Sequence, residues 1–258
     1  MRLMKRILSA AAVLALSASL LVGCSSGTAR SVPVSASSAA ESTVSSVEET
    51  ASSAVDENEA AAAQLLNDLT GSYQELWPVI LADEYKQTWL DDCTALVGED
   101  NAEAAFEKLS SMVTGDVYGE DAVKAYANGG GAYFCGFTNS LAILTFDGET
   151  STISGTDKDG NVLFSHTYHY IGMEPVRGLY EFQSDDADSG EFTYFFLAPD
   201  TSAETYHIEF RYGSDAEALS QYDTGEYAYW LASGISTDCD QTMIDNCIEL
   251  FCTENLAG

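Results

Sequence analysis

Basic residues are scarce in this chain of 258 residues. Ten Lys and Arg stand against 41 Asp and Glu, which gives a formal net charge of −31. Proteins that bind the phosphate backbone of nucleic acids need clusters of Lys and Arg, so the composition argues against a nucleic-acid partner. A surface this acidic is typical of a soluble extracellular domain, and it would also attract cations. The composition leaves both interpretations open.

Paired cysteines and enzyme motifs are missing as well. The six cysteines include no pair separated by two residues and no Cys/His spacing of a zinc site. If Cys24 carries a lipid, five remain, which is not the even number of a disulfide framework. Cys93 and Cys247 lie on apolar faces of expected helices and are predicted to be buried thiols. No nucleophile elbow, phosphate-binding loop or His-Glu-x-x-His segment occurs, so we predict that the protein is not an enzyme.

Residues 1–23 have the features of a bacterial secretion signal. Three of the first six residues are basic (Arg2, Lys5 and Arg6), and the apolar run over residues 7–22 is too short and too rich in Ser and Ala for a membrane span. Its end, Leu21-Val22-Gly23-Cys24, resembles the lipobox of bacterial lipoproteins, which implies cleavage before Cys24 and lipidation of its sulfur, as with palmitate. The alternative is an ordinary signal with a chance cysteine. We predict an extracytoplasmic protein held at the cell membrane by this anchor.

Residues 24–57 form a segment of different composition. Ser, Ala, Val, Thr and Glu dominate it, without an aromatic residue or a sustained apolar period. Such a segment cannot bury enough surface to offset the entropy lost on ordering, so we predict a disordered tether. The remaining residues, 58–258, are enough for one domain with a sizeable core.

Apolar residues at helical spacing predict a helical N-terminal third and a C-terminal helix. In the first helix, Ala60, Ala63, Leu66 and Leu69 are expected on one face, and Asp100 with Glu103 predicts the N-cap of the third. The expected helices cover residues 56–69, 82–97, 100–114 and 238–253.

The pattern changes to short strand-like runs after three consecutive glycines at residues 129–131. Asp147-Gly148 and Asp159-Gly160 lie between such runs and are hairpin signals. Six or more consecutive strands joined by tight turns predict an antiparallel sheet that closes or nearly closes into a barrel. The expected strands cover residues 132–138, 141–146, 162–170, 178–184, 191–197 and 205–212.

Several segments resemble the ZinT family of extracytoplasmic zinc-binding proteins. Residues 204–235 contain that family's strand, glycine turn, acidic helical turn and aromatic closing segment, and residues 69–78 (LTGSYQELWP), 176–182 and 196–199 match further motifs in the family's order. The resemblance implies that residues 58–258 form a lipocalin-like (calycin) barrel, mainly β, with a helical N-terminal region and a C-terminal helix. It also implies zinc as the metal and an ABC-type metal transporter as a partner.

In the ZinT family, a His-x-His pair and an upstream histidine hold the zinc. These positions fall on Thr205, His207 and Phe195, so one ligand of three is present. On a strand, Glu209 would share the face of His207, and His166 lies in a neighbouring run. We predict that a divalent cation, zinc foremost, binds at His207, Glu209 and His166 in a protein that assists metal uptake. The alternative is that His207 only hydrogen-bonds within the barrel and Glu209 is solvated.

A second hypothesis is a barrel that has lost the metal site and binds a small ligand or a protein partner at its mouth. The 14 Tyr and 11 Phe could line such a pocket, or they could simply fill the core. The candidates for lining it are Thr205, Phe195, Tyr206 and Tyr168.

Overall fold

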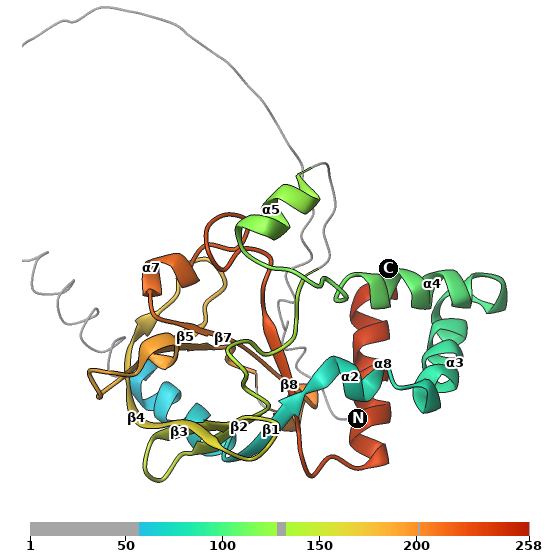
Figure 1. The fold of residues 1–258 in the computed structure, drawn as a ribbon. Helices are drawn as coiled ribbons and strands as arrows, with labels where there is room; N and C mark the ends of the chain where they lie inside the picture. Colours follow the sequence, from blue (N-terminus) through green and yellow to red (C-terminus); the bar gives the residue numbers. More distant parts are fainter. Residues whose placement is uncertain (1–56, 128–132, 201, 258) are drawn as a thin grey trace, which may run out of the picture. The chain divides into compact units, whose positions relative to one another are not determined.

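The computed structural model describes residues 57–127, 133–200 and 202–257 (Figure 1). Residues 57–258 make up one compact unit. The predicted secretion signal and Cys24 lie outside the described residues, as does the predicted tether up to residue 56. Among the described helices, none is both long enough and apolar enough to cross a membrane.

Eight antiparallel strands form a closed barrel, in which each strand pairs with its neighbours in sequence and β8 closes on β1 (Figure 1). The expected antiparallel barrel with N-terminal helices and a C-terminal helix is confirmed. The strands are β1 (Gly71–Glu75), β2 (Ile143–Asp147), β3 (Thr152–Thr156), β4 (Val162–Met173), β5 (Tyr180–Ser184), β6 (Tyr194–Leu197), β7 (Ile208–Gly213) and β8 (Ala232–Ser236).

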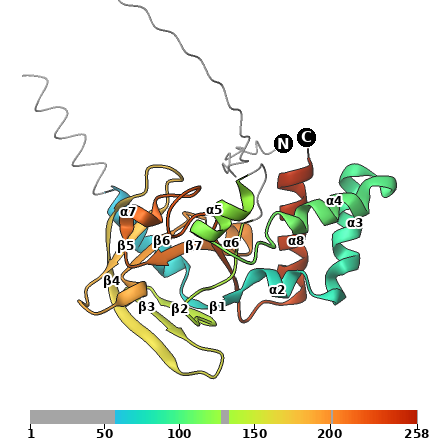
Figure 2. The same cartoon turned by 45° about the horizontal axis from the view of Figure 1, so that its top comes forward.

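Helices precede, interrupt and follow the barrel strands. Residues 57–68 are helical, and α3, α4 and α8 pack together beside the barrel in both views (Figures 1 and 2). Two short 3-10 turns cover Asp83–Tyr85 and Gly190–Phe192. The named helices are α2 (Leu76–Ile80), α3 (Lys86–Val97), α4 (Glu99–Ser111), α5 (Glu120–Tyr126), α6 (Ser202–Thr205), α7 (Ala216–Leu219) and α8 (Gln241–Leu256).

Two details of the helix prediction are wrong. In the first helix Leu66 and Leu69 are buried as predicted, but Ala60 and Ala63 are exposed, and Ala62 and Leu65 complete the buried face instead. The helix α4 begins at Glu99, directly after Gly98 in a positive-φ conformation (84°), so Asp100 lies inside the helix and is not its cap.

Residues 133–138, within the predicted strand over residues 132–138, do not form a strand. Only Phe134 makes isolated bridges, to Thr114 and Trp230. Beyond it, Cys135 O still accepts from Ser233 N at 3.0 Å, but the next residues bond to side chains: Phe137 N donates to Glu75 Oε1 at 2.6 Å, and the Tyr212 hydroxyl donates to Thr138 O at 2.9 Å. These side-chain partners replace a strand ladder, which is why the apolar pattern misled the prediction.

Aromatic side chains fill the interior of the barrel. Phe195 stacks against Phe164 and Tyr212, with ring centroids 5.8 and 5.3 Å apart, and meets Tyr168 edge-on at 5.4 Å. All four residues are buried. An eight-stranded barrel has an interior just wide enough for side chains to fill it. Here these rings form a packed core.

Arg211 fixes the segment that follows α7. Its side chain is fully buried, lies 4.4 Å from the centroid of the Tyr222 ring, and donates to the carbonyl oxygens of Leu219, Gln221 and Tyr227. Removal from water disfavours the charged form, and this burial lowers the pKa of Arg211 to about 10. The buried cation therefore holds residues 219–227 against the barrel wall through backbone carbonyls.

A second apolar core, which we name the helical cluster, lies between α2, α3, α4 and α8. Trp89 is fully buried and its indole Nε1 donates to Ile80 O at 2.7 Å. Phe251 of α8 meets the Trp77 and Trp89 rings edge-on at 4.8 and 5.9 Å. The prediction that Cys93 and Cys247 are buried thiols is confirmed, and both belong to this cluster.

Candidate cation site

A tight turn precedes β7 and sets the position of His207. The helix α6 ends at Thr205, Tyr206 has a positive φ of 64°, and the strand begins only at Ile208. Thr205 Oγ1 donates to His207 O at 2.9 Å and closes the turn. The prediction of a single strand over residues 205–212 is therefore wrong for its first three residues, because positive φ at Tyr206 interrupts the extended backbone.

The hydrogen bond of His207 determines which ring nitrogen is available. Its Nδ1 lies 2.7 Å from Thr205 O. A carbonyl oxygen only accepts, so Nδ1 carries the proton and donates, and the lone pair of the neutral ring is on Nε2. The side chain is 16% exposed, and Nε2 lies 4.0 Å from Glu209 Oε1. Metal-binding histidines are commonly oriented by such a bond from the second ring nitrogen to a backbone carbonyl.

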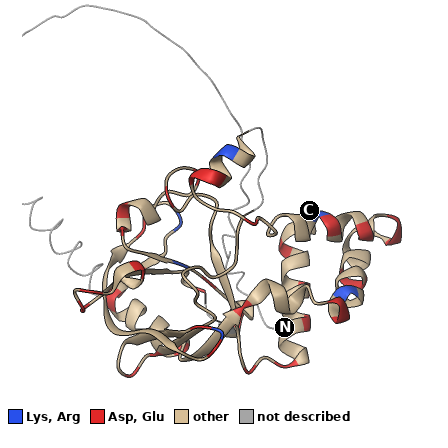
Figure 3. Cartoon of the chain, in the orientation of Figure 1, with Lys and Arg blue, Asp and Glu red and all other residues tan. Residues whose placement is uncertain are grey.

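Carboxylates gather around this imidazole. Burial raises the pKa of Glu254 in α8, the nearby carboxylates Glu209 and Asp200 raise it further, and His207 opposes the shift. Burial likewise raises the pKa of Asp200, where Glu204 adds to the shift and His207 again opposes it. Figure 3 shows Asp and Glu spread over barrel and helices with few Lys and Arg. The surroundings of His207 are therefore strongly negative and partly shielded from water.

The imidazole and the carboxylates are donors that suit a divalent cation. Two of them, His207 and Glu209, also lie close enough together to share one ion. Two donors bound to one zinc at about 2.0–2.2 Å lie at most roughly 4 Å apart, and His207 Nε2 and Glu209 Oε1 are at this limit. A zinc site needs three or four donors. Within the described residues, no group of three or more His, Cys, Asp and Glu is arranged to hold a metal ion. A third donor would have to turn toward the pair.

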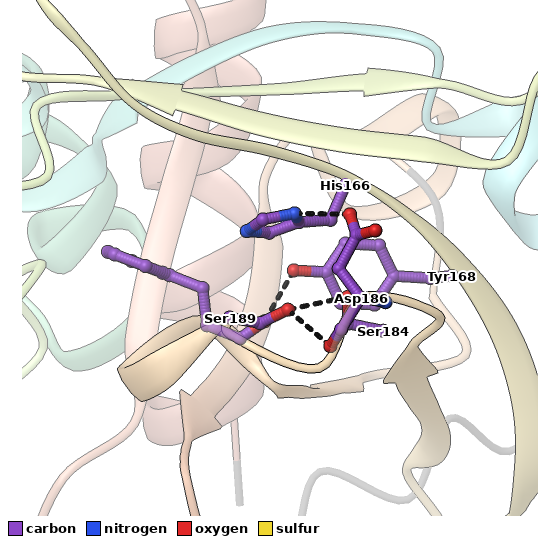
Figure 4. Close-up of polar contacts among 6 residues, drawn as sticks. His166, Tyr168, Ser184, Asp186 and Ser189 are labelled. Carbon is purple, nitrogen blue, oxygen red and sulfur yellow. Dashed lines mark hydrogen bonds and ion pairs between the residues drawn. The ribbon is translucent and has the colours of Figure 1, made fainter.

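His166 lies in a different environment. It belongs to β4, and its side chain contacts the loop between β5 and β6. Figure 4 shows its ring directed at the carboxylate of Asp186, with Nδ1 and Oδ2 2.6 Å apart. Ser189 Oγ, in the same loop, donates to Ser184 Oγ at 2.7 Å and holds the loop closed. A similar pair joins His169 to Asp185 on the other face of the strand, at 2.7 Å.

The predicted set of His207, Glu209 and His166 is therefore not assembled. The strands β5 and β6 separate β4 from β7 in the barrel. By strand period, His166 shares the inner face of β4 with the buried residues Phe164 and Tyr168, whereas His207 precedes β7 and contacts Cys247 of α8, with Nδ1 and Sγ 3.9 Å apart.

The four candidates for lining a ligand pocket separate into two groups. Phe195 and Tyr168 lie in the packed barrel core, and Tyr168 donates its hydroxyl to Phe192 O. Thr205 closes the turn before β7, and Tyr206 packs against the helical cluster. An open hollow of about 410 Å³ lies elsewhere, next to α5, and is lined by Tyr118, Gly119, Glu120, Asp121 and Glu226.

The sequence analysis missed three neighbours of His207: Asp200, Cys247 and Glu254. Cys247 and Glu254 are seven residues apart in α8, so helical spacing indicates that they share a face. No local pattern indicates that this face meets the turn before β7, because that contact depends on how α8 packs.

Comparison with known proteins identifies similar structures but no similar sequence. No protein-family model and no curated protein matches the chain. The crystal structure of the zinc-bound ZinT-like domain of Streptococcus pneumoniae AdcA is 15% identical, with a TM-score of 0.46 over 72% of this chain and 89% of that domain. Zinc-bound AdcA from the same organism is 14% identical, with a TM-score of 0.41 over 75% of this chain, which spans 35% of AdcA.

Proposed function

We propose that this protein binds a divalent cation, zinc foremost, at His207 and Glu209, and that it acts by binding rather than by catalysis. The observation that carries the proposal is the hydrogen bond from His207 Nδ1 to Thr205 O, which leaves Nε2 free to bind a cation beside the Glu209 carboxylate. Imidazole and carboxylate are both ordinary zinc ligands.

Glu254 is the third donor in this proposal. It interacts electrostatically with both His207 and Glu209, whereas the pKa of Asp200 responds to His207 and Glu204. The structure has Glu254 in α8 and Glu209 in β7, so a cation held by both would bridge helix and barrel. Asp200 then adds negative charge without coordination, which favours cation entry.

We further propose that the protein is a lipid-anchored, extracytoplasmic lipoprotein that supplies metal to an ABC-type transporter. The support comes from the sequence: the lipobox-like segment ending at Cys24, the tether-like residues 24–57 and the strongly acidic composition. Labelling with a fatty-acid probe in a bacterial host tests the anchor, because Cys24→Ala should abolish the label. Equal labelling of both proteins would rule out Cys24 as the lipid site.

Calorimetry with zinc tests the cation site directly. The full chain carrying Cys24→Ser, which prevents lipidation, should bind one zinc with a dissociation constant of about 1 μM or tighter. His207→Ala should abolish this binding, because it removes the only nitrogen donor of the proposed site. Glu254→Gln should weaken it by about tenfold or more, since the charge and one oxygen donor are lost.

His166→Ala is the matched control, because it removes a histidine that bonds to Asp186 and not to the site. It should leave zinc affinity unchanged. Loss of binding in this variant would favour the predicted set that includes His166. If the His207→Ala variant binds zinc with the same affinity as the protein that retains His207, the zinc is bound by other carboxylates.

A second candidate function is binding of a protein partner by a barrel without metal. Exposed apolar residues favour it: Ile171 and Met173 at the end of β4 are each 41% exposed, and Val176 in the following turn is 65% exposed. Exposed apolar residues of this size are typical of interaction surfaces when they form a contiguous patch. If calorimetry detects no zinc binding to any variant, this candidate remains.

A further inference from the structure

Two thiols from distant parts of the chain meet in the helical cluster. Cys93 of α3 and Cys252 of α8 are 159 residues apart in sequence, and their Sγ atoms lie 3.9 Å apart. Both side chains are fully buried. The contact joins the N-terminal helices to the C-terminal helix across the middle of the cluster.

The other described thiols have different surroundings. Cys247 faces His207 Nδ1 at 3.9 Å, and Cys135 faces Tyr133 O at 3.8 Å. Cys239 is half-buried, just before α8. In the part of the chain that the structure describes, the contact between Cys93 and Cys252 is the one place where two sulfurs meet.

We propose that Cys93 and Cys252 are a redox pair that forms a disulfide between α3 and α8. The sulfurs of a disulfide are about 2.05 Å apart, so the two Sγ atoms must approach by roughly 2 Å for the bond to form. The reaction is thiol–disulfide exchange. The two thiols lose two protons and two electrons, their S–S bond forms, and the S–S bond of an oxidant such as glutathione disulfide breaks to give two thiols.

The burial of the pair determines when the bond can form. Exchange requires a thiolate and access to the oxidant. In the folded protein neither sulfur is exposed, and burial raises the pKa of both Cys93 and Cys252. The exchange therefore takes place while the chain folds, before α8 closes over α3. Once formed, the disulfide is shielded from reductants by the same packing.

Thiol counting by mass spectrometry tests the proposal. The full chain carrying Cys24→Ser has five cysteines. After refolding in a buffer of oxidised and reduced glutathione, the chain is unfolded in denaturant with iodoacetamide and without reductant. Three of the five thiols should be alkylated, and a non-reduced digest should contain the peptide that joins Cys93 to Cys252.

Thermal unfolding supplies an independent readout. Reductant present during refolding should lower the melting temperature of the protein by roughly 5–15 °C, because the bond closes a long loop in the unfolded chain. The variant Cys252→Ala should show no such difference, whereas Cys247→Ala, the matched control in the same helix, should retain it. Alkylation of all five thiols, or a linked peptide that joins Cys239 to Cys247, would overturn the proposal.

Discussion

The barrel and the helical cluster are stabilised by different kinds of side chain. The barrel interior is built mainly from stacked aromatic rings, such as Phe195 between Phe164 and Tyr212, inside a closed ladder of strands. The helical cluster contains four buried thiols, and one carboxylate oxygen of Asp92, next to Cys93 in α3, is buried as well. Phenylalanine rings do not ionise, whereas thiols can be oxidised, and both thiols and carboxylates can ionise and bind a metal. The buried thiols of the described residues therefore belong to the helical cluster and not to the barrel core.

His207 lies where these two regions meet. Its backbone leads into β7, and its ring contacts Cys247 of α8. A cation bound by Glu209 of the barrel and Glu254 of the helix would hold the two regions together. The proposed disulfide would likewise hold α3 and α8 together within the helical cluster. Three substitutions test how different the two regions are, from the largest expected effect to the smallest.

Removal of a ring from the barrel core should be the most destabilising change. Phe195→Ala deletes a fully buried side chain and leaves a cavity between stacked rings, so the free energy of unfolding should fall by about 3–5 kcal/mol. Guanidinium denaturation followed by circular dichroism measures it. Val162→Ala, at a side chain that is 70% exposed, is the control and should change stability by less than about 0.5 kcal/mol. A loss under about 1 kcal/mol for Phe195→Ala would mean that the interior is loosely filled.

Removal of a hydrogen bond from the helical cluster should lower the free energy of unfolding by a smaller amount. Trp89→Phe keeps an aromatic ring but leaves Ile80 O without its donor, which should cost about 1–3 kcal/mol. Trp77→Phe is the matched control, since Trp77 Nε1 is buried without a nitrogen or oxygen acceptor among the described residues. Urea denaturation of both variants should rank Trp89→Phe as the more destabilised. The reverse order would show that packing, and not the hydrogen bond, determines the loss.

Asp92→Asn should slightly stabilise the protein. One carboxylate oxygen of Asp92 is buried without a hydrogen-bond partner among the described residues. Burial, and then Glu249, Asp245 and Asp91, raise the pKa of Asp92 above its ordinary 3.8. The folded state therefore holds this proton more tightly than the unfolded state, and stability falls as pH rises from about 3.8 through the raised pKa.

Asparagine does not ionise, so it avoids the cost of burying a charge. At pH 7 the Asp92→Asn variant should therefore melt roughly 1–3 °C higher than the wild type. The difference should vanish as pH falls below the ordinary pKa, 3.8, where Asp92 becomes protonated in both states. Differential scanning calorimetry across this pH range measures it. Asp91→Asn, at an exposed position of the same helix, is the control and should show a smaller change. An Asp92→Asn protein that melts lower at pH 7 would contradict the argument.

Much of the fold could be predicted because its signals are local. Helical spacing identified α3 and α8, and the Asp-Gly pairs at residues 147–148 and 159–160 lie in the hairpins that flank β3. The strands β1, β3 and β8 were not among the predicted runs. Segments such as Thr152–Thr156 (TISGT) carry few large apolar residues, and their strand conformation comes from the ladders on either side.

The candidate site could be predicted only in part, because its geometry begins with an exception to a local rule. The alternation around His207 indicated a strand face shared by Thr205, His207 and Glu209. Positive φ at Tyr206 interrupts that strand, and nothing in the alternation of residues 205–212 predicts it. The pairing of His207 with Glu209 survived, since the two remain two residues apart at the start of β7.

The sequence by itself determined the acidic charge, the helical conformation of α3 and α8 and the antiparallel barrel, because side-chain period and turn chemistry operate over a few residues. Only the tertiary structure decided which faces of these elements meet. Cys93 and Cys252 are 159 residues apart and His207 and Cys247 are 40 apart, so each contact depends on the packing of α8 against α3 and the barrel. Packing of this kind is a property of the whole core, and the local pattern of each segment does not contain it.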